Sequence, residues 1–174
     1  MHPSTPPVST PLPSGTPQEW LPAGFVSFCL REPSQCAASP GQPEIVQIDD
    51  SLWAKLQYTN QSINLAVTPK SDNEHYGRGE YWAIVTDGFG DCEDYALTKR
   101  KQLIDAGVPQ RALRIAIVNT PHGDRHAVLT VATDKGDYVL DNLRTEILPW
   151  AKTGYAWVTR QSANGTWDWV ALTP

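Results

Sequence analysis

The spacing of apolar residues divides the chain into a helical first part and a strand-rich second part. Up to residue 67, apolar side chains recur at roughly helical intervals behind three N-cap candidates, Asp49, Asp50 and Ser51. A second helix is predicted to start at residue 91 or 92 and to end near residue 106, where Gly107 and Pro109 provide a stop. We therefore expect two helices before the strands begin.

The second part has short apolar and β-branched runs, which are typical of antiparallel strands. These runs cover residues 113–119, 126–133, 138–141, 155–161 and 166–172. Turn-forming residues separate the second run from the third and the fourth from the fifth, which predicts two hairpins. Helices followed by strands predict an α+β fold with the second helix packed on an antiparallel sheet.

The remaining segments are rich in proline, glycine or serine. Residues 1–19 are expected to form a flexible leader, so the folded domain is predicted to span residues 20–174. Within it, residues 20–43 are predicted to be mainly loop, residues 44–48 a short strand, and residues 69–90 irregular.

Composition and charge exclude some classes of function. The 174 residues are 40% hydrophobic and 19% charged, with a formal net charge of -5, so a globular domain is expected. The acidic balance argues against nucleic acid as the main partner. No apolar run is long enough to span a bilayer. No export signal is recognisable after Met1, so the chain is expected to be cytoplasmic or a form whose signal has been removed.

The three cysteines bear on that choice. Cys29 and Cys36 lie close together, whereas Cys92 is far away in a different context. We interpret Cys29 and Cys36 as a disulfide, which favours a periplasmic or secreted location. Two unpaired thiols in a cytosolic protein are the alternative. A zinc site is disfavoured because the six-residue gap is wider than a usual zinc hook.

Cys92 stands in the segment Gly-Phe-Gly-Asp-Cys-Glu-Asp-Tyr-Ala, residues 88–96, at the start of the second predicted helix. The partial positive charge and free amides of a helix N-terminus favour a thiolate and can stabilise an oxyanion. This placement makes Cys92 a candidate nucleophile. The alternative is a buried structural cysteine.

A nucleophilic thiol needs a base and a group that orients the base. His126 opens a predicted strand, which would hold its backbone rigid, whereas His122 lies between proline and glycine in a loop. Asp141 closes the next strand of the hairpin, at the same end of the sheet as His126. His126 is therefore the preferred base and Asp141 the preferred orienting residue, against a strand-edge histidine and a turn aspartate as alternatives.

Together these segments carry a resemblance to a known family. The cysteine segment, the later Arg-His-Ala-Val-Leu and the Leu-Asp-Asn-Leu are similar to those of the bacterial transglutaminase-like cysteine proteinases, which include the periplasmic LapG-type proteases. The similarity covers roughly residues 20–160. It implies a papain-like fold with Cys92, His126 and Asp141 in the catalytic positions. It also implies a surface adhesin as substrate and a membrane signalling protein as regulator.

Three carboxylates surround the candidate nucleophile. Asp91, Glu93 and Asp94 would oppose thiolate formation unless a cation such as Ca²⁺ neutralised them. LapG-type proteases depend on calcium, and Asp91 and Glu93 match the acidic positions beside their cysteine. In the alternative interpretation Asp91 is an N-cap and the other two are favourable first-turn residues.

We therefore predict a cysteine endopeptidase, with the Cys92 amide and the Asn60 side chain as oxyanion donors. A transglutaminase or amidase activity on the same triad is one alternative. A non-catalytic, calcium-responsive binding module is the other.

Overall fold

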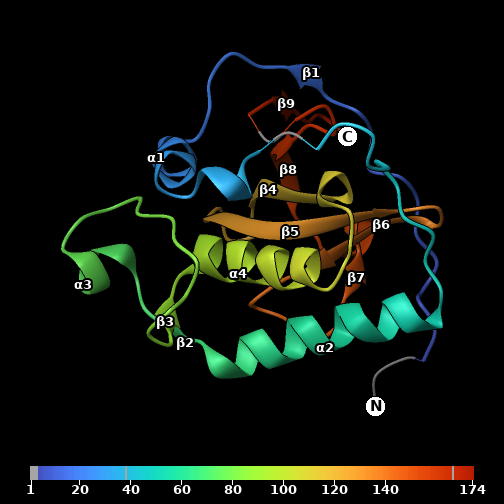
Figure 1. Ribbon diagram of the computed structural model, residues 1–174, viewed down its shortest axis with the longest axis horizontal. Helices are drawn as coiled ribbons and strands as arrows, with labels where there is room; N and C mark the ends of the chain where they lie inside the picture. The colour runs from blue at the N-terminus through green and yellow to red at the C-terminus, as the bar shows by residue number, and fades with distance from the viewer. Residues whose placement is uncertain (1–3, 38, 166) are drawn as a thin grey trace.

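A computed structural model describes residues 4–37, 39–165 and 167–174 of the chain. Its centre is an antiparallel seven-stranded sheet with the order β1-β9-β8-β4-β5-β6-β7 (Figure 1). The strands are β1 (Thr16–Pro17), β4 (Leu113–Asn119), β5 (Arg125–Thr133), β6 (Gly136–Leu140), β7 (Leu148–Pro149), β8 (Ala156–Gln161) and β9 (Trp169–Ala171). The predicted antiparallel sheet is confirmed.

The helices gather mainly on one side of this sheet. Helix α4 packs against β5, and α2 packs on α4, so α4 lies between the sheet and α2 (Figure 1). The helical elements are α1 (Ala23–Arg31), η1 (Pro33–Gln35), α2 (Asp50–Ala66), α3 (Asp72–Tyr76), α4 (Cys92–Asp105), η2 (Gln110–Ala112) and η3 (Trp150–Lys152). The two predicted helices correspond to α2 and α4, and the predicted α+β class is confirmed.

The register of the β5–β6 hairpin determines where His126, in β5, and Asp141, directly after β6, lie. His126 pairs with Val118 of β4, and Leu140, the last residue of β6, pairs with Leu129 of β5. Strand β9 is shorter than the predicted run, whose first residue, Thr166, lies outside the described residues. Of the strand predicted over residues 44–48, the structure has a single bridge between Val46 and Thr133.

The segment predicted to be mainly loop contains helix α1. Phe25, Phe28 and Cys29 are buried on one side of this helix. Cys29 is bonded to Cys36 across the following turn. These buried contacts stabilise a nine-residue helix that would be marginal alone. The tertiary packing explains why the local prediction failed.

The segment predicted to be irregular holds the short helix α3 and two short parallel strands, β2 (Thr68–Pro69) and β3 (Phe89–Gly90). Strand β3 leads directly into α4. This pairing fixes the approach to the helix start that carries Cys92.

Residues 7–17 of the predicted flexible leader instead pack on the sheet. Leu12 is 4% exposed, and its backbone N–H donates to the Asp137 carboxylate at 3.0 Å. The Tyr138 hydroxyl donates to the Pro7 carbonyl at 2.6 Å, and β1 pairs with β9. The leader prediction is wrong because this proline-rich chain satisfies its backbone on the sheet.

Hydrophobic side chains fill both faces of the sheet. The larger core lies between the sheet and the helices and contains Trp53, Leu103, Leu129 and Tyr138. A smaller cluster on the opposite face includes Leu12, Val128 and Trp157. Among the described residues, no helix combines the length and the apolar character that crossing a membrane requires.

Candidate active site

Cys92 is the first residue of α4, as predicted, and is half-buried. Gly90, two residues earlier, packs so tightly that an added Cβ would lie 2.8 Å from the Asp94 Cβ and 3.0 Å from Val85. A side chain at position 90 would therefore displace the first turn of α4. The glycine in this motif has a steric role in placing the thiol.

His126 and Asp141 meet at the end of the β5–β6 hairpin. The His126 Nε2 lies 2.8 Å from the Asp141 Oδ1, and these residues are 6% and 2% exposed. The Tyr155 hydroxyl donates to the Asp141 Oδ2 at 2.5 Å. Burial alone would raise the pKa of Asp141, but the hydrogen bonds from His126 and Tyr155 outweigh it and lower that pKa. Asp141 is thus held as a carboxylate against the imidazole.

The Cys92 sulfur has two neighbours that act on its charge in opposite directions. The thiol donates to the Glu93 carboxylate at 3.2 Å. The backbone amide of Ala127, the residue after His126, donates toward the sulfur. Burial and the negative charge of Glu93 raise the pKa of Cys92 well above its usual value, and the amide offsets only part of this. In this arrangement the thiol is protonated.

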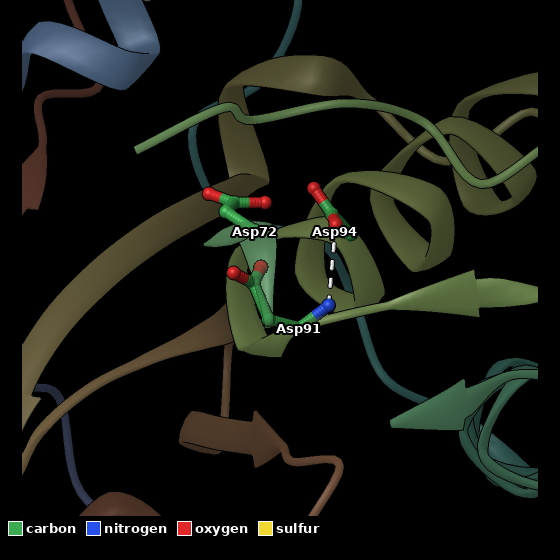
Figure 2. Close-up of side chains that lie close together, drawn as sticks. All are labelled: Asp72, Asp91 and Asp94. Atoms are coloured by element: carbon green, nitrogen blue, oxygen red, sulfur yellow. Dashed lines mark hydrogen bonds between the residues drawn. The ribbon is translucent and has the colours of Figure 1, made fainter. Parts of the chain in front are cut away.

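A cluster of three aspartates lies beside Cys92. One carboxylate oxygen from each of Asp72, Asp91 and Asp94 lies within 4.8 Å of the others (Figure 2). Asp72 comes from α3, and the other two flank Cys92. Of the predicted set of Asp91, Glu93 and Asp94, the structure brings Asp91 and Asp94 together with Asp72, whereas the Glu93 carboxylate contacts the thiol.

The chemistry of this cluster fits a hard cation. Among the described residues, Asp72 Oδ1 and Asp91 Oδ1 are buried without a hydrogen-bond partner. Burial and the charge of Glu93 raise the pKa of Asp91 to about 8. Burial and the charge of Asp91 raise the pKa of Asp94 to about 7. Unpaired carboxylate oxygens that are costly to ionise are suitable ligands for Ca²⁺.

The predicted oxyanion donor Asn60 has a different role. Its side chain is fully buried, and its Nδ2 donates to the carbonyls of Arg144 and Thr145, each at 3.2 Å. Both amide hydrogens are therefore committed to the loop that follows Asp141. This contact corrects the prediction and leaves the backbone amide of Cys92 as the oxyanion donor that the sequence indicated.

Two cavities are lined by residues of this site. One, of about 230 Å³, is lined by residues that include Trp20, Trp82 and His126. The other, of about 330 Å³, is lined by residues that include Cys92 and Asn142.

Two residues of this site were missed from the sequence. Asp72 precedes Cys92 by 20 residues, and its local sequence indicates only an acidic residue at a helix start. Tyr155 was assigned only to a strand, yet its hydroxyl contacts Asp141 and its ring lies edge-on to His126. Both reach the site through tertiary structure, which single-sequence patterns do not encode.

Comparison with known proteins gives consistent matches. Residues 16–174 match the bacterial transglutaminase-like cysteine proteinase (BTLCP) family. The chain is similar to Legionella pneumophila LapG in its calcium-bound structure, with 28% identity, a TM-score of 0.59 and 69% of each chain covered. The EGTA-treated LapG structure gives 28% identity and a TM-score of 0.60, covering 70% of this chain and 68% of that one. No curated protein sequence matches the chain.

Proposed function

The chain belongs to the bacterial transglutaminase-like cysteine proteinases, and on that basis we propose that it cleaves a protein substrate with Cys92 as nucleophile, His126 as base and Asp141 as orienting residue. That the protein is a cysteine protease of transglutaminase-like type follows from its family and its structural relatives. The observation that carries the residue assignment is the buried 2.8 Å contact between His126 and Asp141.

The proposed mechanism follows from which ring nitrogen of His126 contacts Asp141. Because Nε2 of His126 contacts Asp141, Nδ1 is the nitrogen that accepts the proton of Cys92. The sulfur then attacks the substrate carbonyl carbon, and the Cys92 backbone amide stabilises the oxyanion. His126 returns the proton to the leaving amine, which leaves an acyl-enzyme. His126 next takes a proton from water, which attacks the thioester and releases the acid and the thiol.

We also propose that the aspartate cluster holds Ca²⁺ through Asp72, Asp91 and Asp94. When bound, the cation would neutralise negative charge beside the nucleophile. Support comes from the two unpaired buried oxygens of Asp72 and Asp91. The calcium-bound state of the LapG structure is consistent with this assignment.

Endopeptidase activity is supported by the two cavities, one lined in part by His126 and the other by Cys92, because an internal peptide bond needs room for the chain in both directions. Transglutaminase or amidase activity on the same residues remains the second candidate. The two differ in whether water or an amine resolves the acyl-enzyme.

For the setting, we propose a periplasmic or secreted location, supported by the Cys29–Cys36 disulfide. The resemblance to LapG-type proteases extends the proposal to a surface adhesin as substrate and a membrane-anchored protein as regulator.

The proposal is tested by alkylation of Cys92 with iodoacetamide in wild type, His126→Ala and His122→Ala. We expect His126→Ala to slow labelling by at least about tenfold at pH 7, since the thiol loses its base. His122 lies in the nearby turn after β4, so His122→Ala is the matched control and should label like wild type. Added Ca²⁺ should speed labelling of the wild type. Equal labelling of all three proteins would contradict the assignment of His126.

Peptide-bond cleavage is tested separately with a denatured peptide library. New peptide termini should form with wild type and Ca²⁺ but not with Cys92→Ser. Incorporation of a fluorescent primary amine without new termini would instead favour the transglutaminase alternative.

A further inference from the structure

A cavity on the sheet is lined by charged residues that the proposed mechanism does not use. It has a volume of about 290 Å³ and is lined by residues of the N-terminal segment, of β4, and of β8 with the turn that follows it. The polar residues of this lining include Ser14, Glu44, Arg114, Arg160, Ser162 and Asn164. Arg114 pairs with Thr130, which lies four residues, or about 13 Å, further along β5 than His126. The cavity is therefore separate from the candidate active site.

The register of the sheet places the two arginines of this cavity next to each other. Arg160 of β8 pairs with Ala116 of β4, and Arg114 lies two residues before Ala116. Alternate residues of a strand point to the same face, so Arg114 and Arg160 are diagonal neighbours on one face, with backbones about 7 to 8 Å apart. Burial, followed by the positive charge of Arg160, lowers the pKa of Arg114 to about 10. Two like charges on one face need negative charge nearby.

An aspartate supplies that charge for Arg160. This arginine is 4% exposed, and its Nη1 donates to the Asp137 carboxylate at 2.8 Å. The same carboxylate oxygen accepts from the backbone N–H of Leu12 at 3.0 Å. Among the described residues, the buried Nε of Arg160 has no hydrogen-bond partner. Asp137 therefore neutralises Arg160 but leaves one of its donors unsatisfied.

Arg114 has no such carboxylate. Its Nε and Nη2 donate to the backbone carbonyls of Arg111 and Glu44, at 2.9 and 3.0 Å. The carboxylate of Glu44 is instead paired with the guanidinium of Arg111 at 2.5 Å. Carbonyl oxygens carry no net charge, so in the described part of the chain the charge of Arg114 is not balanced by an ion pair.

The other walls of the cavity carry hydrogen-bond donors on backbone that is held in place. The Asn164 N–H donates to the Ser162 hydroxyl at 3.1 Å, which fixes the turn after β8. Gly15 packs so closely on β9 that a Cβ added to it would lie 1.9 Å from the Ala171 carbonyl oxygen. The hydroxyls of Ser14 and Ser162 and the side-chain amide of Asn164 can all donate hydrogen bonds. A rigid lining of donors with one unbalanced guanidinium is suited to an anion.

We propose that this cavity binds a small oxyanion, a phosphate or carboxylate group, beside Arg114 and Arg160. Both kinds of group present two oxygens to the planar fork of a guanidinium, which binds them through two parallel hydrogen bonds. The anion would balance the charge of Arg114, and the serine and asparagine donors would bind its remaining oxygens. The site goes beyond the proposed peptidase function and does not depend on it.

The test is a titration followed by the backbone amide NMR signals of residues 162–165, in the full chain at pH 7. Sodium phosphate, sodium acetate and sodium chloride are compared at equal ionic strength. Phosphate, acetate or both should shift these signals along a saturating curve, whereas chloride should not. Which salt saturates the site distinguishes a phosphate ligand from a carboxylate ligand.

Variants test the role of the arginine. Arg114→Gln should raise the Kd at least about tenfold, because a hydrogen bond to a charged group is lost. Arg114→Lys keeps the charge without the planar fork, so it should bind more weakly than wild type, and it replaces the glutamine variant if that one does not fold. Arg78→Gln is the matched control: it removes the same charge from an exposed arginine that lies over the Tyr81 ring, and it should bind like wild type.

Two outcomes would overturn the proposal. One is that chloride shifts the signals as phosphate and acetate do, or that none of the three salts shifts them. The other is that the Arg114 variants bind as tightly as wild type. In either case the arginines serve only the fold. Because the readout is binding at residues 162–165, these outcomes say nothing for or against the role of Cys92.

Discussion

At the scale of single residues, the first turn of α4 concentrates negative charge where the proposed reaction would form a thiolate. Asp72, Asp91 and Asp94 converge on one side of the helix start, and Glu93 contacts the thiol itself. Such a site is stable only if the carboxyls are protonated or a cation is present. Its protonation should therefore be visible in the stability of the whole protein.

We predict that stability without metal falls as the pH rises from about 4 to about 8. Burial, followed by the negative charge of Glu93, raises the pKa of Asp91 from 3.8 to about 8. Burial, followed by the negative charge of Asp91, raises the pKa of Asp94 from 3.8 to about 7. Each folded carboxyl thus holds a proton that the unfolded one has lost, so the stabilisation is complete below the unfolded pKa and is lost as the pH rises through the folded pKa.

The measurement is the melting temperature against pH in EGTA and in Ca²⁺. Asp91→Asn should flatten the EGTA curve, and Ca²⁺ should raise the melting temperature most at the alkaline end, where the ligands are ionised. Asp105→Asn, at an exposed acid on the same helix, serves as control. A flat EGTA curve with no effect of Ca²⁺ would show that the cluster neither titrates in this range nor binds the metal.

Residues at the ends of regular elements could be placed from the sequence, and those brought in by long-range packing could not. His126 and Asp141 were expected at one end of the sheet, and the structure places them in contact. Asp72 and Tyr155 were missed because no local pattern predicts that α3 lies beside the start of α4 or that Tyr155 reaches the end of the β5–β6 hairpin. Asn60 was misassigned because its partners lie in a loop whose path no local pattern describes.

At the scale of elements, α1 and η1 depend on a covalent link. The Cys29–Cys36 bond closes a loop that contains the end of α1 and all of η1. The guanidinium of Arg100, a buried residue of α4, donates to the Gln35 carbonyl at 2.9 Å beside that turn. The disulfide therefore holds a surface helix against the helix that carries Cys92.

We predict that the Cys29→Ala/Cys36→Ala variant is less stable by about 2.5 kcal/mol, as expected for opening an eight-residue loop. The measurement is urea unfolding of the variant and of wild type with and without dithiothreitol. Reduction should lower the stability of the wild type toward that of the variant and leave the variant itself unchanged. Equal stability of oxidised wild type and variant would show that packing alone holds α1.

Elements with strong local signals were the predictable ones. Helix α2 begins behind a side-chain cap at Asp49, and α4 ends just before Gly107, so both boundaries follow from local chemistry. Helix α1 begins after Pro22 without a side-chain cap, and its stability comes from contacts such as that of Phe25 with Trp82. Strand order could not be predicted, because the pairing of β4 with β8 joins segments 40 residues apart.

At the scale of the whole molecule, the N-terminal segment completes the second core. It runs along β6, where the Asp137 N–H donates to the Thr10 carbonyl at 3.0 Å, and ends in β1 at the opposite edge of the sheet (Figure 1). Gly136, with φ of 110°, lies so close to Thr10 that a Cβ added to the glycine would be 2.5 Å from the Thr10 backbone nitrogen. The segment is therefore a structural layer of the domain.

Leu12→Ala should accordingly destabilise the protein by about 2 to 5 kcal/mol, the usual cost of removing a buried leucine side chain. Val8 belongs to the same segment but is 91% exposed, so Val8→Ala should leave stability unchanged. Urea unfolding of both variants is the measurement. If the two variants have equal stability, the segment does not contribute to the core in solution.

The pairing of β1 with β9 has a consequence for how the chain is made. Residues 12–17 acquire their partners only when residues 137–171, far later in the chain, have been synthesised. Contacts between segments so far apart delay folding. During this interval Cys29, Cys36 and Cys92 are all accessible to one another. We therefore expect that correct oxidation of the first two depends on an early encounter within their short turn, because an exchange with Cys92 would trap the nucleophile.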